Sequence, residues 1–275
     1  MDPRVLNNSN MSVGLNMSSQ TPQIQQNRDD VMNLLAQASG CLIQQRMELF
    51  EIITGCETKN IYDVALKINN SFYTTFKCKE ISSCWCRNFC PSEKREFLMD
   101  IKYTPNGVDF GSWAFIERPF KCSCYCCCRP EMKVSLRNGQ YIGSVTEPWG
   151  CCQVMIDIIN GQNQLKYQID RTFCETAFLC KKSCYGDIAS VDFPLLAVDP
   201  MNPSNRMPDG IIVRKGRDLL TTFIQSDADN FDVVFPKFAS PQEKLLIISA
   251  VLMLDFRYFE ESGRRDDSKN LRLNI

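Results

Sequence analysis

Short stretches of alternating apolar and polar residues, separated by turn residues, fill most of the chain from Cys41 to Phe235. Alternation with a period of two is typical of a β-strand that has one face in a core. The pattern predicts about ten to twelve strands. They fall at Glu48–Ile53, Tyr62–Lys67, Phe72–Lys77, Glu96–Tyr103, Val108–Glu117, Met132–Leu136, Tyr141–Thr146, Val154–Ile159, Gln164–Ile169, Ile188–Phe193, Ile211–Arg214 and Asp232–Phe235.

Pairs of turn residues join several of these strands. Asn106-Gly107, Asn138-Gly139 and Asn160-Gly161 each stand between two predicted strands, and Asn69-Asn70 joins another two. An Asn-Gly pair is a strong hairpin signal, because both residues tolerate the positive φ angles of a type I′ turn. The three pairs predict an antiparallel meander with type I′ turns.

One stretch near the end of the chain is apolar on every side. From Leu245 to Leu254 only Ser249 is polar, and such a helix must be buried all round, in a protein core or in a bilayer. The run is about 10 residues, or roughly 15 Å of helix, whereas a bilayer needs about 20. Asp255 and Arg257 follow at once. We therefore expect a core helix, with a membrane-spanning helix as the alternative.

Many strands and a single apolar helix fit together in one architecture. A closed barrel removes exposed strand edges, and the helix fills its interior. The expected fold is all-β, an antiparallel β-barrel that encloses a C-terminal apolar α-helix.

The barrel domain should occupy residues 39–262, with its helix at 243–259, and a short polar tail should follow at 263–275. Residues 1–38 are rich in Asn, Gln and Ser and should form a disordered or weakly helical arm. A short helix at Asp29–Gln37 is the less favoured reading of that arm.

Composition restricts the chemistry. Lys and Arg number 31 and Asp and Glu 32, a formal net charge of −1, so we expect no nucleic-acid partner. Histidine is absent, which excludes Ser-His-Asp and Cys-His catalysis and every zinc site with a histidine ligand. Neither a glycine-rich phosphate loop nor a carboxylate pair stands out, and we expect that the protein is not an enzyme.

The chain has 16 cysteines, several of them adjacent. Its first residues lack the apolar core of a signal peptide, so we expect reduced thiols that face the cytosol. Five cysteines share one loop, and their acylation beside basic residues would anchor the chain to a membrane. These candidates for lipidation are Cys122, Cys124, Cys126, Cys127 and Cys128.

Two alternatives remain for the same loop: unmodified thiols, or a zinc site with four thiolate ligands. Further zinc ligands would come from elsewhere in the chain. They are Cys84, Cys86, Cys90, Cys174, Cys180 and Cys184.

An acidic segment precedes the apolar helix. Asp227, Asp229 and Asp232 stand at positions 1, 3 and 6 of a possible calcium loop. An EF-hand loop has Gly at position 6 and a bidentate Glu at position 12, whereas position 12 here is Phe238. The segment is either a weak calcium site or a solvated acidic turn before a strand.

Taken in order, these segments resemble the phospholipid scramblase family from about Gly40 to Gly263. The resemblance is carried by a few motifs in sequence. They are Gln44-Gln45, Thr54–Asn60, Glu117-Arg118-Pro119 before the cysteines, Tyr185-Gly186-Asp187, Ser226–Phe231, Phe235-Pro236 and Asp255–Gly263.

The resemblance implies a tubby-like fold, a twelve-stranded barrel around a central C-terminal helix. It also implies calcium-stimulated, ATP-independent movement of phospholipids in both directions between bilayer leaflets, with acyl chains on the five loop cysteines. The implied calcium ligands are Asp227, Asp229 and the backbone carbonyls of Phe231 and Val233. Because the family has Gly and Asp where this chain has Asp232 and Phe238, we expect weak calcium binding.

Two other functions stay open. The first is an acylated barrel that lies against a membrane and binds head groups or protein partners in signalling. The second is a zinc-stabilised lipid-binding domain. The expected location is the cytoplasmic face of the plasma membrane, with a phospholipid membrane as partner and self-association as one way to open a lipid path.

Overall fold

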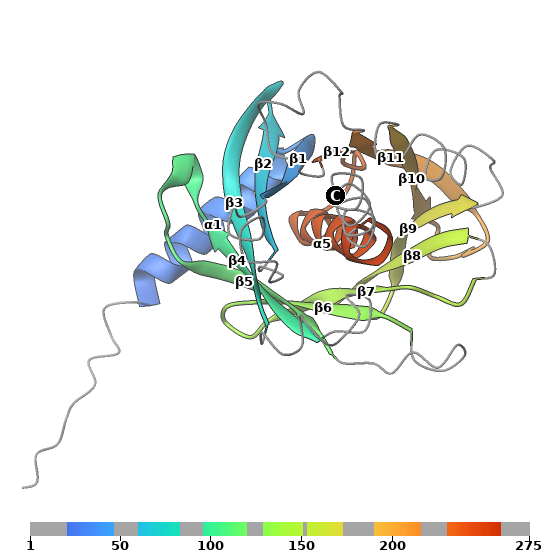
Figure 1. Ribbon diagram of the computed structural model, residues 1–275, viewed down its shortest axis with the longest axis horizontal. Coiled ribbons are helices and arrows are strands. Elements are labelled where there is room, and N and C mark those ends of the chain that lie inside the picture. The colour runs from blue at the N-terminus through green and yellow to red at the C-terminus, as the bar shows by residue number, and fades with distance from the viewer. Residues whose placement is uncertain are drawn as a thin grey trace, which may run out of the picture.

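The computed structural model is a closed barrel of antiparallel strands wrapped around a helix (Figure 1). It describes residues 21–46, 60–82, 96–119, 129–150, 153–172, 190–215 and 230–259. Each strand pairs with its neighbours in sequence, and β1 pairs with β12 to close the barrel. The predicted fold is confirmed.

The helices are α1 (Thr21–Gln37) and α5 (Pro241–Tyr258). The strands are β1 (Gly40–Arg46), β2 (Ile61–Ile68), β3 (Ser71–Ile81), β4 (Phe97–Tyr103), β5 (Ser112–Arg118), β6 (Glu131–Leu136), β7 (Tyr141–Thr146), β8 (Gln153–Asn160), β9 (Leu165–Thr172), β10 (Val191–Val198), β11 (Arg206–Lys215) and β12 (Asn230–Val234).

Strand β1 was not among the predicted strands, and the predicted strand Glu48–Ile53 lies outside the described residues. The alternating pattern of β1 is short. Only Cys41 and Ile43 are buried apolar residues at alternate positions, and polar residues follow them. Gly40 opens the strand, where a Cβ atom would stand 2.2 Å from the Val233 carbonyl oxygen. This close approach of β1 and β12 requires glycine.

The turns follow the prediction only in part. Asn69 and Asn70 both have positive φ, 49° and 62°, as a type I′ turn requires. At the second and third Asn-Gly pairs the type I′ prediction is wrong, because only Gly139 has positive φ in one and neither residue has it in the other. Asn160 instead uses its Oδ1 to accept hydrogen bonds from the backbone N–H of residues 162 and 164.

Residues 21–37 of the arm that was predicted to be disordered or weakly helical form the helix α1. Val31 and Leu35, one helical turn apart, are fully buried against the barrel core. Two inward-facing apolar residues at this spacing give the helix a face to bury. The less favoured prediction of a helix at Asp29–Gln37 was therefore closer to the structure, although the observed helix begins earlier, at Thr21.

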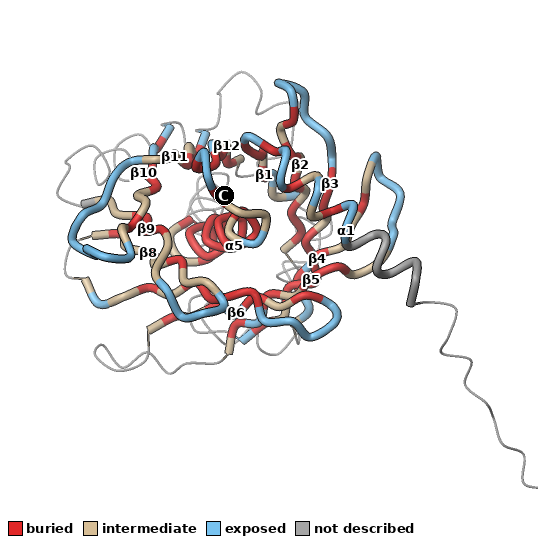
Figure 2. Tube along the Cα trace, turned by 180° about the vertical axis from the view of Figure 1, so that it is seen from behind, coloured by how far each residue is buried: buried red, intermediate tan, exposed pale blue. Residues whose placement is uncertain are grey.

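Helix α5 fills the barrel, and every residue from Lys244 to Phe256 is buried (Figure 2). Its start is fixed by Pro241 in the first turn and by a capping box, in which Ser240 and Glu243 each satisfy a backbone N–H of the other. The predicted core helix is confirmed. Among the helices that the structure describes, none is long and apolar enough to span a membrane.

Buried polar contacts fix the position of α5 inside the barrel. The Lys244 ammonium donates to the carbonyl oxygens of Leu35, Ala36 and Ala38 at 2.9, 3.0 and 2.9 Å, and so caps the C-terminal end of α1. Burial lowers the pKa of Lys244. Farther along, Asp255 accepts a 2.6 Å hydrogen bond from the Tyr62 hydroxyl.

The antiparallel order gives the barrel two different ends. At the turn end lie the described connections β2–β3, β4–β5, β6–β7, β8–β9, β10–β11 and β12–α5. At the other end, which we call the cysteine end, lie the connections β1–β2, β3–β4, β5–β6, β7–β8, β9–β10 and β11–β12. Helix α5 starts at the turn end and finishes at the cysteine end.

Replacing Lys244 by methionine should lower the free energy of unfolding by about 2–4 kcal/mol, because three carbonyl groups at the end of α1 lose their donor. Urea denaturation measures this change, and hydrogen exchange should show faster opening of α1. Lys237→Met, at an exposed position, is the matched control and should change stability by less than about 0.5 kcal/mol. An unchanged Lys244→Met protein would contradict the role of this contact.

Candidate functional site

The segments that the sequence marks as functional all attach to one end of the barrel. The five candidate lipidation cysteines lie between β5 and β6, and Asp227 and Asp229 lie between β11 and β12. Both connections belong to the cysteine end. These cysteines and aspartates lie outside the described residues, so the structure places only the points where their segments begin and end.

Fourteen of the 16 cysteines belong to connections at this end. One lies between β1 and β2, three between β3 and β4, five between β5 and β6, two between β7 and β8, and three between β9 and β10. The sequence alone does not reveal this grouping, because it depends on which connections share an end of a closed barrel.

The two remaining cysteines, Cys41 and Cys78, lie inside the barrel wall and are fully buried. Burial, reinforced by nearby carboxylates, raises the pKa of both thiols. A thiol must ionise to react or to bind a metal, so these two are inert structural residues. The chemistry expected of cysteine therefore belongs to the other fourteen.

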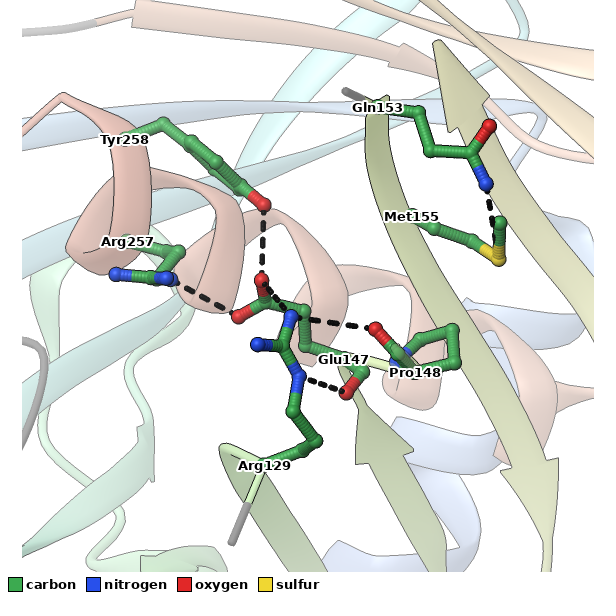
Figure 3. A network of polar contacts seen from close by, with 7 residues as sticks. All are labelled: Arg129, Glu147, Pro148, Gln153, Met155, Arg257 and Tyr258. Atoms are coloured by element: carbon green, nitrogen blue, oxygen red, sulfur yellow. Dashed lines mark hydrogen bonds and ion pairs between the residues drawn. The ribbon is translucent and has the colours of Figure 1, made fainter. Parts of the chain in front are cut away.

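Glu147 is the centre of a polar network at the cysteine end (Figure 3). One carboxylate oxygen accepts from Arg129 at 2.6 Å and from the Tyr258 hydroxyl at 3.3 Å, and the other accepts from Arg257 at 2.9 Å. Arg129 also donates to the Pro148 carbonyl oxygen. Glu147 is only 5% exposed, so two guanidinium groups compensate a nearly buried carboxylate.

This network, which we call the Glu147 clamp, joins three parts of the chain. Arg129 is the first described residue after the cysteine segment 120–128, Glu147 opens the β7–β8 connection, and Arg257 and Tyr258 end α5. Burial and the neighbouring Glu147 raise the pKa of Tyr258. The clamp holds the end of the cysteine segment against the end of the central helix.

Arginines stacked on aromatic rings line the same end of the barrel interior. Arg214 lies 4.2 Å from the ring centroid of Phe259, and Arg118 lies 5.6 Å from that of Phe97. Both arginines are less than 5% exposed, a setting in which cation–π attraction is strongest. The sequence carried a signal for both, because Arg118 and Arg214 fall at inward positions of the strand alternation and Arg118 belongs to the Glu117-Arg118-Pro119 motif.

Of the four calcium candidates, only Phe231 and Val233 lie among the described residues. Phe231 and Val233 lie in β12 with buried side chains and pair with both β1 and β11. Because β12 passes through this stretch, Phe238 lies at the turn end, opposite the connection that carries Asp227 and Asp229. Asp232 pairs with Lys215 at 3.4 Å. Within the described ranges, no three Cys, Asp or Glu residues are grouped as metal ligands.

Replacing Glu147 by glutamine should lower the free energy of unfolding by about 1–3 kcal/mol, because two partly buried guanidinium groups lose their countercharge. Chemical denaturation measures the loss, and the exposed Glu117→Gln is the matched control. A double-mutant cycle with Arg257→Met should show coupling of at least about 0.5 kcal/mol. Additive effects in that cycle would contradict the clamp.

Comparison with known proteins gives one consistent result. Residues 17–261 match the family model described as Scramblase. Human phospholipid scramblase 1 is 29% identical over 253 residues, which cover 91% of this chain and 72% of that protein. Mouse phospholipid scramblase 1 is 28% identical over 240 residues, covering 86% and 65%, and human phospholipid scramblase 4 is 30% identical over 237 residues, covering 84% and 64%.

The chain thus spans roughly two thirds of the length of these relatives. No solved structure matches it. The family match begins at residue 17, before the start of α1, and ends at residue 261, after the end of α5. It therefore includes the whole barrel and both helices. The chain belongs to the scramblase family.

Proposed function

We propose that this protein moves phospholipids passively between the two leaflets of a membrane, in both directions, without ATP and with stimulation by calcium. The observation that carries the proposal is the family match over residues 17–261, together with relatives named phospholipid scramblases. It acts at a membrane, for which we propose the cytoplasmic face of the plasma membrane.

The barrel interior does not offer the lipid path. Helix α5 fills it, and polar contacts of Lys244 near its start and of Asp255 and Arg257 in its last turn hold the helix at both ends. A head group therefore crosses along the outer surface of the barrel, where the protein perturbs or thins the bilayer, and self-association of several barrels would widen such a zone.

We propose that the cysteine end holds both regulatory elements. Acyl chains on Cys122, Cys124, Cys126, Cys127 and Cys128 would anchor this end, since two lipid signals give stable attachment. Asp227 and Asp229 would bind calcium weakly, with the carbonyl groups of Phe231 and Val233 as further candidate ligands at the start of β12. Support comes from the attachment of both segments to one end of the barrel.

A second candidate function is a membrane-anchored interaction protein that does not itself move lipid. The filled barrel favours it, because α5 leaves no path through the interior. Zinc bound by cysteines of the cysteine end is a further alternative. Elemental analysis below one zinc per chain would remove it.

Purified protein in liposomes with fluorescent phospholipid should accelerate exchange between leaflets when calcium is added at millimolar concentration. Dithionite bleaching of the outer-leaflet probe measures the rate. Asp227→Ala should raise the calcium concentration required by at least about tenfold, because one carboxylate ligand is lost. The acidic control Asp199→Ala lies at the turn end and should behave as the parent protein.

No acceleration by the parent protein at millimolar calcium would contradict the proposed activity and favour the interaction protein. Substituting the five cysteines by alanine separates anchoring from transport. In protein already inserted in liposomes this variant should retain its rate, whereas in cells a smaller share of it should be found in the membrane fraction.

A further inference from the structure

Exposed apolar side chains lie at the turn end of the barrel, whose connections the structure describes in full. The described residues expose eleven large apolar side chains, and nine of them lie at the turn end. Ile81 and Trp149 are the two at the cysteine end. We call the six at or beside the turn tips the apolar rim: Phe72, Tyr73, Val108, Phe110, Met201 and Phe238.

The β4–β5 turn presents two rim residues on a fixed backbone. Asp109 accepts a 2.8 Å hydrogen bond from Lys102 and one of 2.7 Å from the backbone N–H of Gly111. The Phe110 N–H donates to the Tyr103 carbonyl oxygen. Val108 and Phe110 remain 59% and 51% exposed on this ordered turn, so their exposure is built into the fold.

Two rim rings carry a lysine beside them. The Lys67 ammonium lies 5.8 Å from the ring centroid of Phe72, and the Lys237 ammonium lies 5.5 Å from that of Phe238. An aromatic ring with a neighbouring ammonium suits the boundary of a bilayer, because the ring enters the apolar layer while the cation reaches lipid phosphates.

The arrangement of the rim favours a lipid bilayer over a protein as its partner. The six side chains come from four separate connections around a closed barrel, so they form spaced tips and not one continuous patch. A rigid protein would need a matching pocket for each tip, whereas a fluid bilayer receives all of them at once. The membership of the chain in the scramblase family also points to phospholipid.

We propose that the apolar rim is a surface that inserts into the head-group layer of a phospholipid bilayer, independently of the cysteines. This goes beyond the proposed function, which places the lipid anchors at the opposite end of the barrel. Because the two contacts lie at opposite ends, protein without acyl chains should still bind vesicles through the rim.

Quenching by brominated lipid locates the inserted end. Unacylated full-length protein would be studied on vesicles of phosphatidylcholine and phosphatidylserine, with Trp85 replaced by phenylalanine throughout. One variant keeps Trp149, which is 64% exposed at the cysteine end, and the other carries Phe238→Trp and Trp149→Phe; the buried Trp113 is common to both. Quenching should occur for the tryptophan at position 238 and not for Trp149.

Quenching of Trp149 without quenching at position 238 would overturn the proposal, and so would vesicle binding that quenches neither. Either result leaves the transport assay unaffected, because that assay does not depend on which end inserts. The rim and the proposed transport activity can therefore fail separately.

Substitution of the rim gives an independent test. The triple variant Phe72→Ser, Phe110→Ser and Phe238→Ser should weaken vesicle partitioning by at least about tenfold, because three partly inserted rings are lost. Ile81→Ser, which removes an apolar side chain of similar exposure at the other end, is the matched control and should partition as the parent does.

Thermal unfolding of the triple variant should confirm that it is folded, since all three side chains are exposed at or beside turns. Unchanged partitioning would overturn the proposal. A third result would also overturn the proposal. If the parent protein does not bind vesicles but self-associates, and the triple variant is monomeric, the rim is a contact between copies of this chain.

Discussion

The enclosure of one apolar helix is the constraint on which the structure depends. Residues 245–254 have almost no polar face, so α5 needs apolar surroundings on every side. A flat sheet covers one side of a helix, whereas a closed barrel covers all of them and leaves no strand edge exposed. The barrel in turn needs a filling, so helix and strands stabilise one another as a single core.

Charged residues decide where the helix sits within that enclosure. Lys244 joins its first turn to the end of α1, Asp255 meets Tyr62 inside the barrel, and Arg257 and Tyr258 meet Glu147. Moving the helix into a bilayer would break these contacts and cost about 2.5–3.5 kcal/mol for each charge brought near the bilayer centre. The same residues that break the apolar run in the sequence therefore hold the helix in the barrel.

Local patterns carry much of the fold. The strand alternation locates β2 to β12, and the apolar run locates α5, because both features are encoded by neighbouring residues. Strand β1 escapes detection because glycine and glutamines weaken its pattern. The Glu147 clamp and the capping of α1 by Lys244 also escape it, because each joins residues that are distant in sequence and adjacent only after the barrel closes.

The candidate site divides in the same way. Composition alone marks the cysteine segment and the acidic segment, but only the strand order shows that both attach to one end, opposite the apolar rim. Both ends of a barrel whose interior is filled are therefore available for contact with lipid.

The central claim is that α5 remains the core of the barrel when the protein is bound to lipid. A diazirine analogue of phenylalanine at Phe256 tests it, because that ring lies 4.6 Å from Phe97 and 6.1 Å from Tyr62 between ring centroids. Illumination of protein in vesicles should cross-link α5 to peptides that contain Phe97 or Tyr62. Cross-linking to lipid acyl chains instead would show that the helix leaves the barrel and would contradict this account.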